Sequence, residues 1–174
     1  NKESEKKFEW PPLEGDPEIF NKYSYKIGLL EEYMFEELIS LDYKDMGMAI
    51  ETPVKAVIVN SERPEGVARY FVKENMKGWN VVPLYMKQQG SLDNSCGLIA
   101  ILQSLGNVRD SLPFKSDSIL SKFYESTKDM DDVKRCQFLE DYKEFKEEHS
   151  SISGEGQSNL CENQEAVRNH FVSY

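Results

Sequence analysis

A strongly apolar helix is predicted in the middle of this 174-residue chain, directly after a cysteine. Leucine and isoleucine recur from residue 98 to residue 105 at the three- and four-residue spacing of a helix. Asn94 and Ser95 come just before it, and both side chains are suited to capping a helix N-terminus. Cys96 is therefore expected in the first turn, where unpaired backbone N–H groups and the positive end of the helix dipole favour a thiolate over a thiol.

Two interpretations of Cys96 follow from its surroundings. A cysteine in an apolar helix is most often a small buried hydrophobic side chain. A thiol nucleophile, in contrast, needs an oxyanion donor and a base. Gln88 and Gln89 lie just upstream across a Gly/Ser/Asp turn, so a side-chain amide could fold back beside the sulfur. Whether a base can reach Cys96 decides between the two interpretations.

The chain contains two histidines, and their surroundings differ. His149 lies in the charged sequence KEEHSS, for which we expect a solvated, inert side chain at a helix end. His170 lies in VRNHFVSY, whose alternation predicts a strand that would hold the ring in place. A long separation along the chain allows Cys96 and His170 to meet in space, although a histidine in a strand can also be a core residue.

Composition excludes several classes of function. Acidic residues outnumber basic ones by 31 to 21, and the net charge of −10 disfavours nucleic acid and anionic membranes as partners. Three cysteines without zinc-type spacing indicate neither a disulfide scaffold nor a metal site. The charged N-terminus is not a signal peptide, and no apolar run is long enough to span a bilayer. We therefore expect a cytoplasmic protein, with the nucleus as a further compartment.

The chain is long enough for one sizeable core and has no Pro/Gly/Ser-rich linker, so residues 1–174 are predicted to form a single domain. A first helix is predicted at 18–27, with Asp16 as its cap and Gly28 as its end. The further segments that we predict are helices at 117–126 and 131–150, strands at 54–60 and 81–87 with a helix between them, and a loop at 150–164 that contains Cys161. The segment 33–41 fits either a strand or a helix by its pattern.

Several short motifs follow one another along nearly the whole chain. In order they are WPPLE at 10–14 with DPE at 16–18, PVKAVI at 53–58, KQ at 87–88, NSCG at 94–97, EGQ at 155–157 and HF at 170–171. None of these motifs is decisive alone. Together, and in this order, they resemble the ubiquitin C-terminal hydrolases, a family of papain-like cysteine deubiquitinases.

The resemblance implies an α/β fold with a central antiparallel sheet flanked by helices and a knotted backbone, which would be incomplete in this chain. For the segment 33–41 the resemblance favours a strand. It also implies that Cys96 is the nucleophile, His170 the general base, and Gln88 the oxyanion donor beside the backbone N–H of Cys96. The implied reaction removes small adducts or peptides from the C-terminal glycine of ubiquitin through a thioester, without metal or cofactor. Ubiquitin, through its tail and basic face, is the implied partner of an expected monomer.

Two departures from the family pattern leave alternatives open. Seven residues separate Gln88 from Cys96, a longer interval than the family shows, so Gln89 stays a second candidate for the oxyanion donor. The family's orienting aspartate, in a Glu-Leu-Asp-Gly segment after the histidine strand, has no counterpart before Tyr174, and we expect this chain to be part of a longer protein. The alternative functions are a ubiquitin-binding module with impaired catalysis and, less favoured, a papain-like amidase that acts on another substrate.

Overall fold

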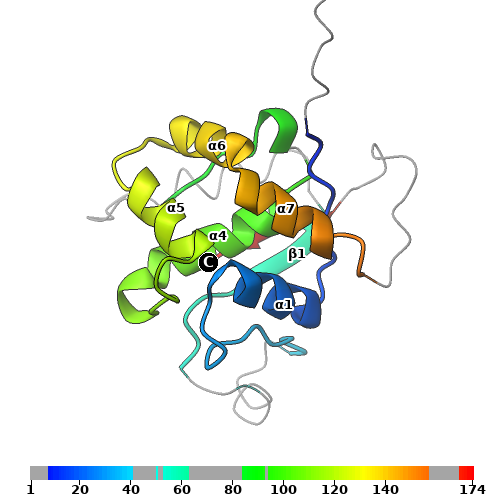
Figure 1. Ribbon diagram of the computed structural model, residues 1–174. Coiled ribbons are helices and arrows are strands. Elements are labelled where there is room, and N and C mark those ends of the chain that lie inside the picture. The colour runs from blue at the N-terminus through cyan, green and yellow to red at the C-terminus, as the bar shows by residue number, and fades with distance from the viewer. Residues whose placement is uncertain (1–7, 41–49, 51–52, 63–83, 93, 157–168) are drawn as a thin grey trace, which may run out of the picture.

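Helices surround one central helix, α4 (Cys96–Val108), and a small sheet lies against it (Figure 1). The computed structural model describes residues 8–40, 50, 53–62, 84–92, 94–156 and 169–174. The other elements in these ranges are α1 (Pro17–Ile27), β1 (Ile58–Glu62), the 3-10 turns η1 (Gly90–Leu92) and η2 (Arg109–Ser111), α5 (Ile119–Thr127), α6 (Asp132–Asp141), α7 (Lys143–Ile152) and β2 (Asn169–Ser173). Among the described helices, none combines the length and apolarity that crossing a bilayer requires.

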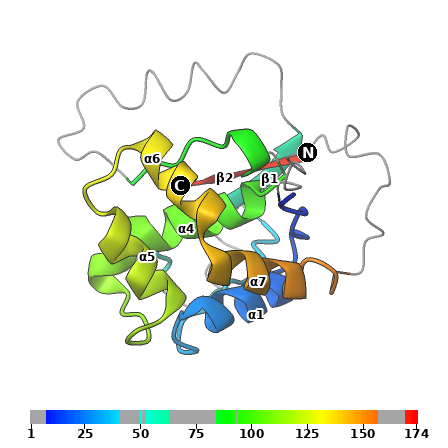
Figure 2. The same cartoon turned by 45° about the horizontal axis from the view of Figure 1, so that its top comes forward.

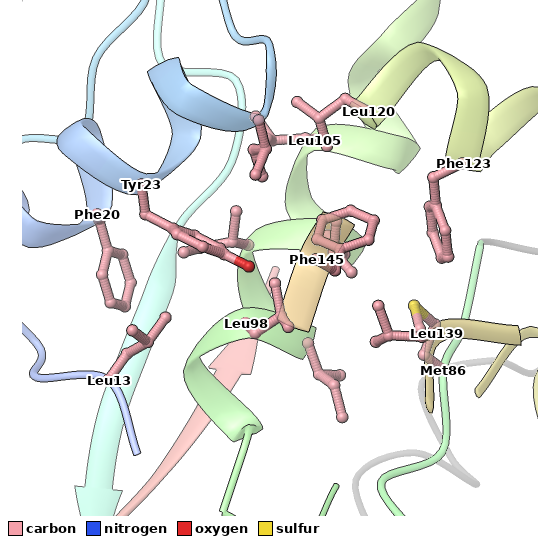
Figure 3. Close-up of a cluster of buried hydrophobic side chains, with 14 of the residues drawn as sticks. Leu13, Phe20, Tyr23, Met86, Leu98, Leu105, Leu120, Phe123, Leu139 and Phe145 are labelled. Atoms are coloured by element: carbon pink, nitrogen blue, oxygen red, sulfur yellow. The ribbon is translucent and has the colours of Figure 1, made fainter. Parts of the chain in front are cut away.

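Helix α4 forms the centre of the hydrophobic core. Its Leu98, Ile101 and Leu102 are fully buried. Side chains of α1, α5, α6 and α7 belong to the same core, as the labelled residues of Figure 3 illustrate. A helix that is apolar over most of its surface is stable only where other elements cover it. The helix predicted after Ser95 is therefore confirmed, and its burial brings the first turn inside the molecule.

Helix α1 has the ends that its sequence predicts. The carboxylate of Asp16 accepts a hydrogen bond from the backbone N–H of Glu18 at 2.7 Å, and a proline takes the first helical position. At the other end Gly28 has φ +123°, and its N–H donates to the carbonyl oxygen of Ser24. A Cβ atom at residue 28 would overlap the side chain of Ser118. Both the backbone conformation and the available space therefore require glycine at this helix end.

Strands β1 and β2 pair antiparallel, with Ser61 opposite His170. Two more backbone hydrogen bonds, of 2.9 and 2.8 Å, join Val57 and Tyr174 beyond the strands. The strand predicted around His170 is thus confirmed, and the α/β architecture with an antiparallel sheet is as expected. The strand predicted at 54–60 begins later than its sequence indicates, because the extent of a strand depends on its partner.

The strand predicted at 81–87 is wrong for the part that the structure describes. Leu84 donates its backbone N–H to Asn107 Oδ1 at 2.7 Å, and Asn107 Nδ2 donates back to the carbonyl oxygen of Leu84 at 2.9 Å. The N–H of Met86 donates to Gln103 Oε1 at 3.4 Å. Side-chain amides of α4 therefore occupy main-chain groups that a neighbouring strand would otherwise bind, which the local pattern cannot reveal.

The strand that the family resemblance favours at 33–41 is wrong for the described part, 33–40, which is neither strand nor helix. The side chain of Asn21 on α1 binds both backbone groups of Phe35, accepting its N–H at 2.6 Å and donating to its carbonyl at 2.9 Å. Helix α1 thus supplies the partners that a sheet would have supplied. The helix predicted between residues 60 and 81 falls almost entirely outside the described residues.

The single helix predicted at 131–150 is two helices, α6 and α7, which meet at Tyr142. This residue has φ −76° and ψ 104°, an extended conformation. Its ring contacts those of Phe138 and Phe145, with centroid separations of 5.3 Å in both cases. Neither proline nor glycine marks this break, so the local sequence gives no sign of it. The helix predicted at 117–126 is confirmed as α5.

Helix α7 lies beside α1 in both orientations (Figures 1 and 2). It continues to Ile152, so the loop predicted at 150–164 starts later than expected. Glu155 forms an ion pair with Lys22 of α1, and Gly156 lies directly against the side chain of Glu14. The described beginning of the loop is therefore held to α1 and to the segment before it. Cys161 lies outside the described residues.

Candidate active site

Cys96 begins α4 and is 9% exposed. Ser95 occupies the N-cap position, but its hydroxyl donates to the carbonyl oxygen of Leu92 at 2.8 Å and makes no capping bond. The carbonyl of Ser95 accepts the N–H of Ile99 at 2.9 Å, which starts the helical ladder. The predicted side-chain cap is therefore wrong for Ser95. The N–H groups of the first turn of a helix have no partner within the helix, and they point toward the end of α4 that carries the thiol.

The residue after Cys96 packs against the residue after His170. A Cβ atom at Gly97 would lie 3.6 Å from two ring carbons of Phe171 and 3.3 Å from Cβ of Leu13. Helix α4 and strand β2 are in direct contact, and Figure 2 shows the strand beside the helix. His170 itself is partly buried. The fold thus brings together the two segments that carry the predicted nucleophile and the predicted base.

Gln88 and Ser95 share one acceptor, the carbonyl oxygen of Leu92. Gln88 Nε2 donates to this oxygen at 3.1 Å, the N–H of Ser95 at 3.0 Å and the hydroxyl of Ser95 at 2.8 Å. Gln89 takes part through its main chain, because its carbonyl accepts the N–H of Leu92 at 3.2 Å. The amide of Gln88 is therefore linked through one carbonyl to the residue that precedes Cys96.

His149 is not the solvated surface residue that its sequence predicts. It is fully buried, its Nε2 lies 2.6 Å from the carbonyl oxygen of Pro11, and its ring contacts Trp10 and Tyr23. Because a carbonyl only accepts, Nε2 carries the hydrogen. Burial lowers the pKa of His149 to about 4, and the hydrogen bond to Pro11 opposes this only in part. The prediction of a solvated side chain rested on the charged neighbours in KEEHSS. It was wrong because these neighbours occupy other faces of α7.

Cys136 on α6 is the other cysteine that the structure describes. Its thiol is fully buried and donates to the carbonyl oxygen of Lys87 at 2.9 Å. Burial raises the pKa of this thiol to about 11, so it is protonated at neutral pH and a poor nucleophile. The described residues contain no group of three or more side chains that could hold a metal ion. Of the two described cysteines, Cys96 is the one suited to nucleophilic chemistry.

The residues of this site all lie within a match to a known protein family. A family model described as ubiquitin carboxyl-terminal hydrolase, family 1, matches residues 10–174. The chain belongs to this family. A ubiquitin carboxyl-terminal hydrolase of Aplysia californica is 26% identical over 164 residues, which cover 94% of this chain and 75% of the relative. Ubiquitin carboxyl-terminal hydrolase isozyme L1 of Rattus norvegicus is 26% identical over 166 residues, covering 94% and 72%.

A solved structure has the same fold. It is the crystal structure of the Trichinella spiralis UCH37 catalytic domain bound to ubiquitin vinyl methyl ester, with a TM-score of 0.64 and 23% identity. The match covers 96% of this chain and 70% of that chain. The likeness confirms the predicted fold class. Membership of the ubiquitin carboxyl-terminal hydrolases confirms the predicted class of enzyme, a thiol-dependent deubiquitinase.

The sequence does not reveal that the carbonyl of Leu92 binds both Gln88 and Ser95 in this hydrolase. Ser95 was predicted to cap the helix, which is the common role of a serine in that position. A main-chain carbonyl leaves no mark in a sequence, because every residue has one. The glycine at residue 90, which has φ +62°, was the available sign that a tight turn separates the glutamine from the cysteine.

Proposed function

We propose that Cys96 attacks the carbonyl carbon of the C-terminal glycine of ubiquitin, and that the enzyme releases small adducts or peptides from it. The match to the hydrolase family over residues 10–174 carries this proposal. The position of Cys96 in the first turn of α4, with Gly97 packed against Phe171 of β2, supports it.

In the proposed reaction, His170 takes the proton of the Cys96 thiol, and the resulting thiolate adds to the carbonyl carbon and forms a tetrahedral oxyanion. His170 then donates a proton to the leaving amine as the C–N bond breaks, and a thioester is left on the enzyme. The neutral imidazole next takes a proton from water, whose oxygen attacks the thioester. The C–S bond breaks, and ubiquitin leaves with a free carboxylate. This sequence of steps uses no cofactor.

The proposed oxyanion hole combines the side-chain amide of Gln88 with the backbone N–H of Cys96. Such donors are effective when they are held in place before charge develops. Gln88 is favoured over Gln89, because its amide already donates to the carbonyl of Leu92 that also binds Ser95.

Ubiquitin is the proposed partner, bound through its tail and its basic face. The Trichinella spiralis neighbour was crystallised with ubiquitin vinyl methyl ester, and the net charge of −10 on this chain complements a basic partner. We further propose that the protein acts as a cytoplasmic monomer with one catalytic domain, and that it binds neither nucleic acid nor membranes.

Covalent labelling with ubiquitin vinyl methyl ester tests the proposal. We expect an adduct at Cys96, no adduct in Cys96→Ala, and much slower labelling in His170→Gln. Cys136→Ser is the matched control: it should label normally, because serine keeps a donor for the carbonyl of Lys87. Tight ubiquitin binding without labelling would contradict the proposed hydrolase and favour a ubiquitin-binding module. An adduct that persists in Cys96→Ala would place the nucleophile elsewhere.

A further inference from the structure

Helix α6 binds the main chain around Gln88 at three points. The contacts are Arg135 Nη1 to the carbonyl of Tyr85, the thiol of Cys136 to the carbonyl of Lys87, and Glu140 to Ser91. Side chains of α4 bind residues 84 and 86 of the same segment. Helix α4, which follows this segment in the chain, and helix α6, about fifty residues away, therefore hold the segment that carries the proposed oxyanion donor.

Glu140 makes its contact at the turn η1. Its Oε1 accepts two hydrogen bonds from Ser91, one from the backbone N–H and one from the hydroxyl, both at 2.7 Å. A Cβ atom at Gly90 would lie 2.5 Å from the same oxygen, so the carboxylate lies directly against the turn. Hydrogen bonds to an ionised carboxylate are shorter and stronger than those between neutral groups. Glu140 therefore fixes the position of this turn.

The turn that Glu140 holds ends at Leu92, whose carbonyl binds both Gln88 and Ser95. A primary amide has two N–H donors. The bond from Gln88 to Leu92 orients the plane of the amide and so determines the direction of its other N–H. Because Ser91 directly precedes Leu92, a displacement of Ser91 moves the shared carbonyl and the amide with it.

We propose that Glu140 is a positioning residue for the oxyanion hole. This inference rests on the proposed function, in which Gln88 donates to the oxyanion. Glu140 acts through Ser91 and Leu92 on the amide of Gln88, and its effect belongs to the step in which the oxyanion forms.

The test compares hydrolysis of a ubiquitin C-terminal amide with alkylation of Cys96 by iodoacetamide. Hydrolysis passes through an oxyanion, whereas alkylation displaces iodide and forms none. In Glu140→Ala, kcat should fall about 10- to 100-fold, since a donor misplaced by about 1 Å loses much of its effect. We expect KM and the alkylation rate at Cys96, measured by mass spectrometry, to stay within about twofold of the wild type, because neither depends on the oxyanion.

Three variants separate positioning from stability. Glu140→Gln keeps an oxygen that accepts from Ser91 and should retain most of kcat. Ser91→Ala removes the hydroxyl bond and keeps the backbone bond, so its loss should be intermediate. Asp141→Asn is the matched control, because it removes one negative charge from the next, exposed position of α6 and should leave kcat unchanged.

Gln88→Ala distinguishes failure of this inference from failure of the proposed function. If Gln88→Ala lowers kcat and Glu140→Ala does not, the inference is overturned and the proposed function stands. If Gln88→Ala leaves kcat intact, the proposed oxyanion donor is wrong and the inference falls with it. Equal losses of hydrolysis and alkylation in Glu140→Ala would also overturn positioning. Support requires that Glu140→Ala adds little further loss in the Gln88→Ala background.

Discussion

A hydrogen bond from His149 joins α7 to the segment that precedes α1. Its Nε2 donates to the carbonyl of Pro11, and the rings of Trp10 and Tyr23 lie 5.1 and 5.7 Å from the imidazole. Trp10 is 1% exposed and Tyr23 is fully buried, so a charge on the imidazole would lie away from water. This burial is why the folded protein holds the ring neutral, with a pKa of about 4.

The burial of His149 predicts a specific pH dependence of stability. The unfolded chain binds a proton at this residue near pH 6.5 and the folded protein near pH 4, so stability falls as the pH decreases between these values. Between about pH 7 and pH 5 this residue should cost roughly 2 kcal/mol of unfolding free energy. Urea unfolding measures the loss of unfolding free energy between the two pH values. In His149→Phe this loss should be smaller than in the wild type by about 2 kcal/mol. Equal losses in both proteins would contradict the prediction.

At the scale of elements, the end of α1 meets the start of α5. The carbonyl of Gly28 accepts the N–H of Lys115 at 2.9 Å, and Leu29 pairs with Phe114 in an isolated antiparallel bridge. Ser118, the N-cap of α5, lies against Gly28. One glycine therefore ends α1 and makes room for the cap of α5.

Gly28→Ala should destabilise the protein by about 2 to 4 kcal/mol, because a Cβ atom meets both a positive φ and the side chain of Ser118. Gly154→Ala is the matched control. A Cβ atom there has nothing within 4 Å, so its effect should stay within about 0.5 kcal/mol. Urea unfolding of both variants measures the difference. The prediction fails if the two substitutions cost the same.

Across the whole molecule, the net charge of −10 governs association more than stability. The described ion pairs are exposed or partly exposed, as in the pair between Lys26 and Glu148 at 3.5 Å, and such pairs contribute little to folding. The apolar core around α4 holds the fold, and a net negative charge of this size attracts basic molecules at longer range.

If ubiquitin binds through its basic face, KM for a ubiquitin substrate should rise several-fold between about 50 mM and about 300 mM salt, because salt screens exposed charges. The value of kcat should change little. Alkylation of Cys96 by neutral iodoacetamide is the internal control and should not depend on salt. A KM that does not change with salt would contradict the proposal that electrostatic attraction contributes to ubiquitin binding.

Local sequence was sufficient to predict those helices and strands whose caps, ends or apolar spacing lie within a few residues of one another. The cap at Asp16 and the glycine at residue 28 delimit α1, and the apolar run after Ser95 predicts α4 with Cys96 in its first turn. Alternation around His170 predicted β2. The order of the short motifs was sufficient to identify the family, because a family is recognised by which residues occur at separated positions, and this needs no structure. The assignments of catalytic roles and of the cellular compartment stay predictions.

Tertiary contacts decided the features whose determinants lie far away in the chain. Residues 84–87 have a strand-like pattern, but amides of α4 bind their main chain. His149 stands among charged residues, but its helix turns that one face toward α1 and Pro11. Glu140 and Ser91 are separated by nearly fifty residues and meet at the turn before Cys96. A pattern along the chain shows which groups need partners, but only packing in space determines which distant residue supplies each one.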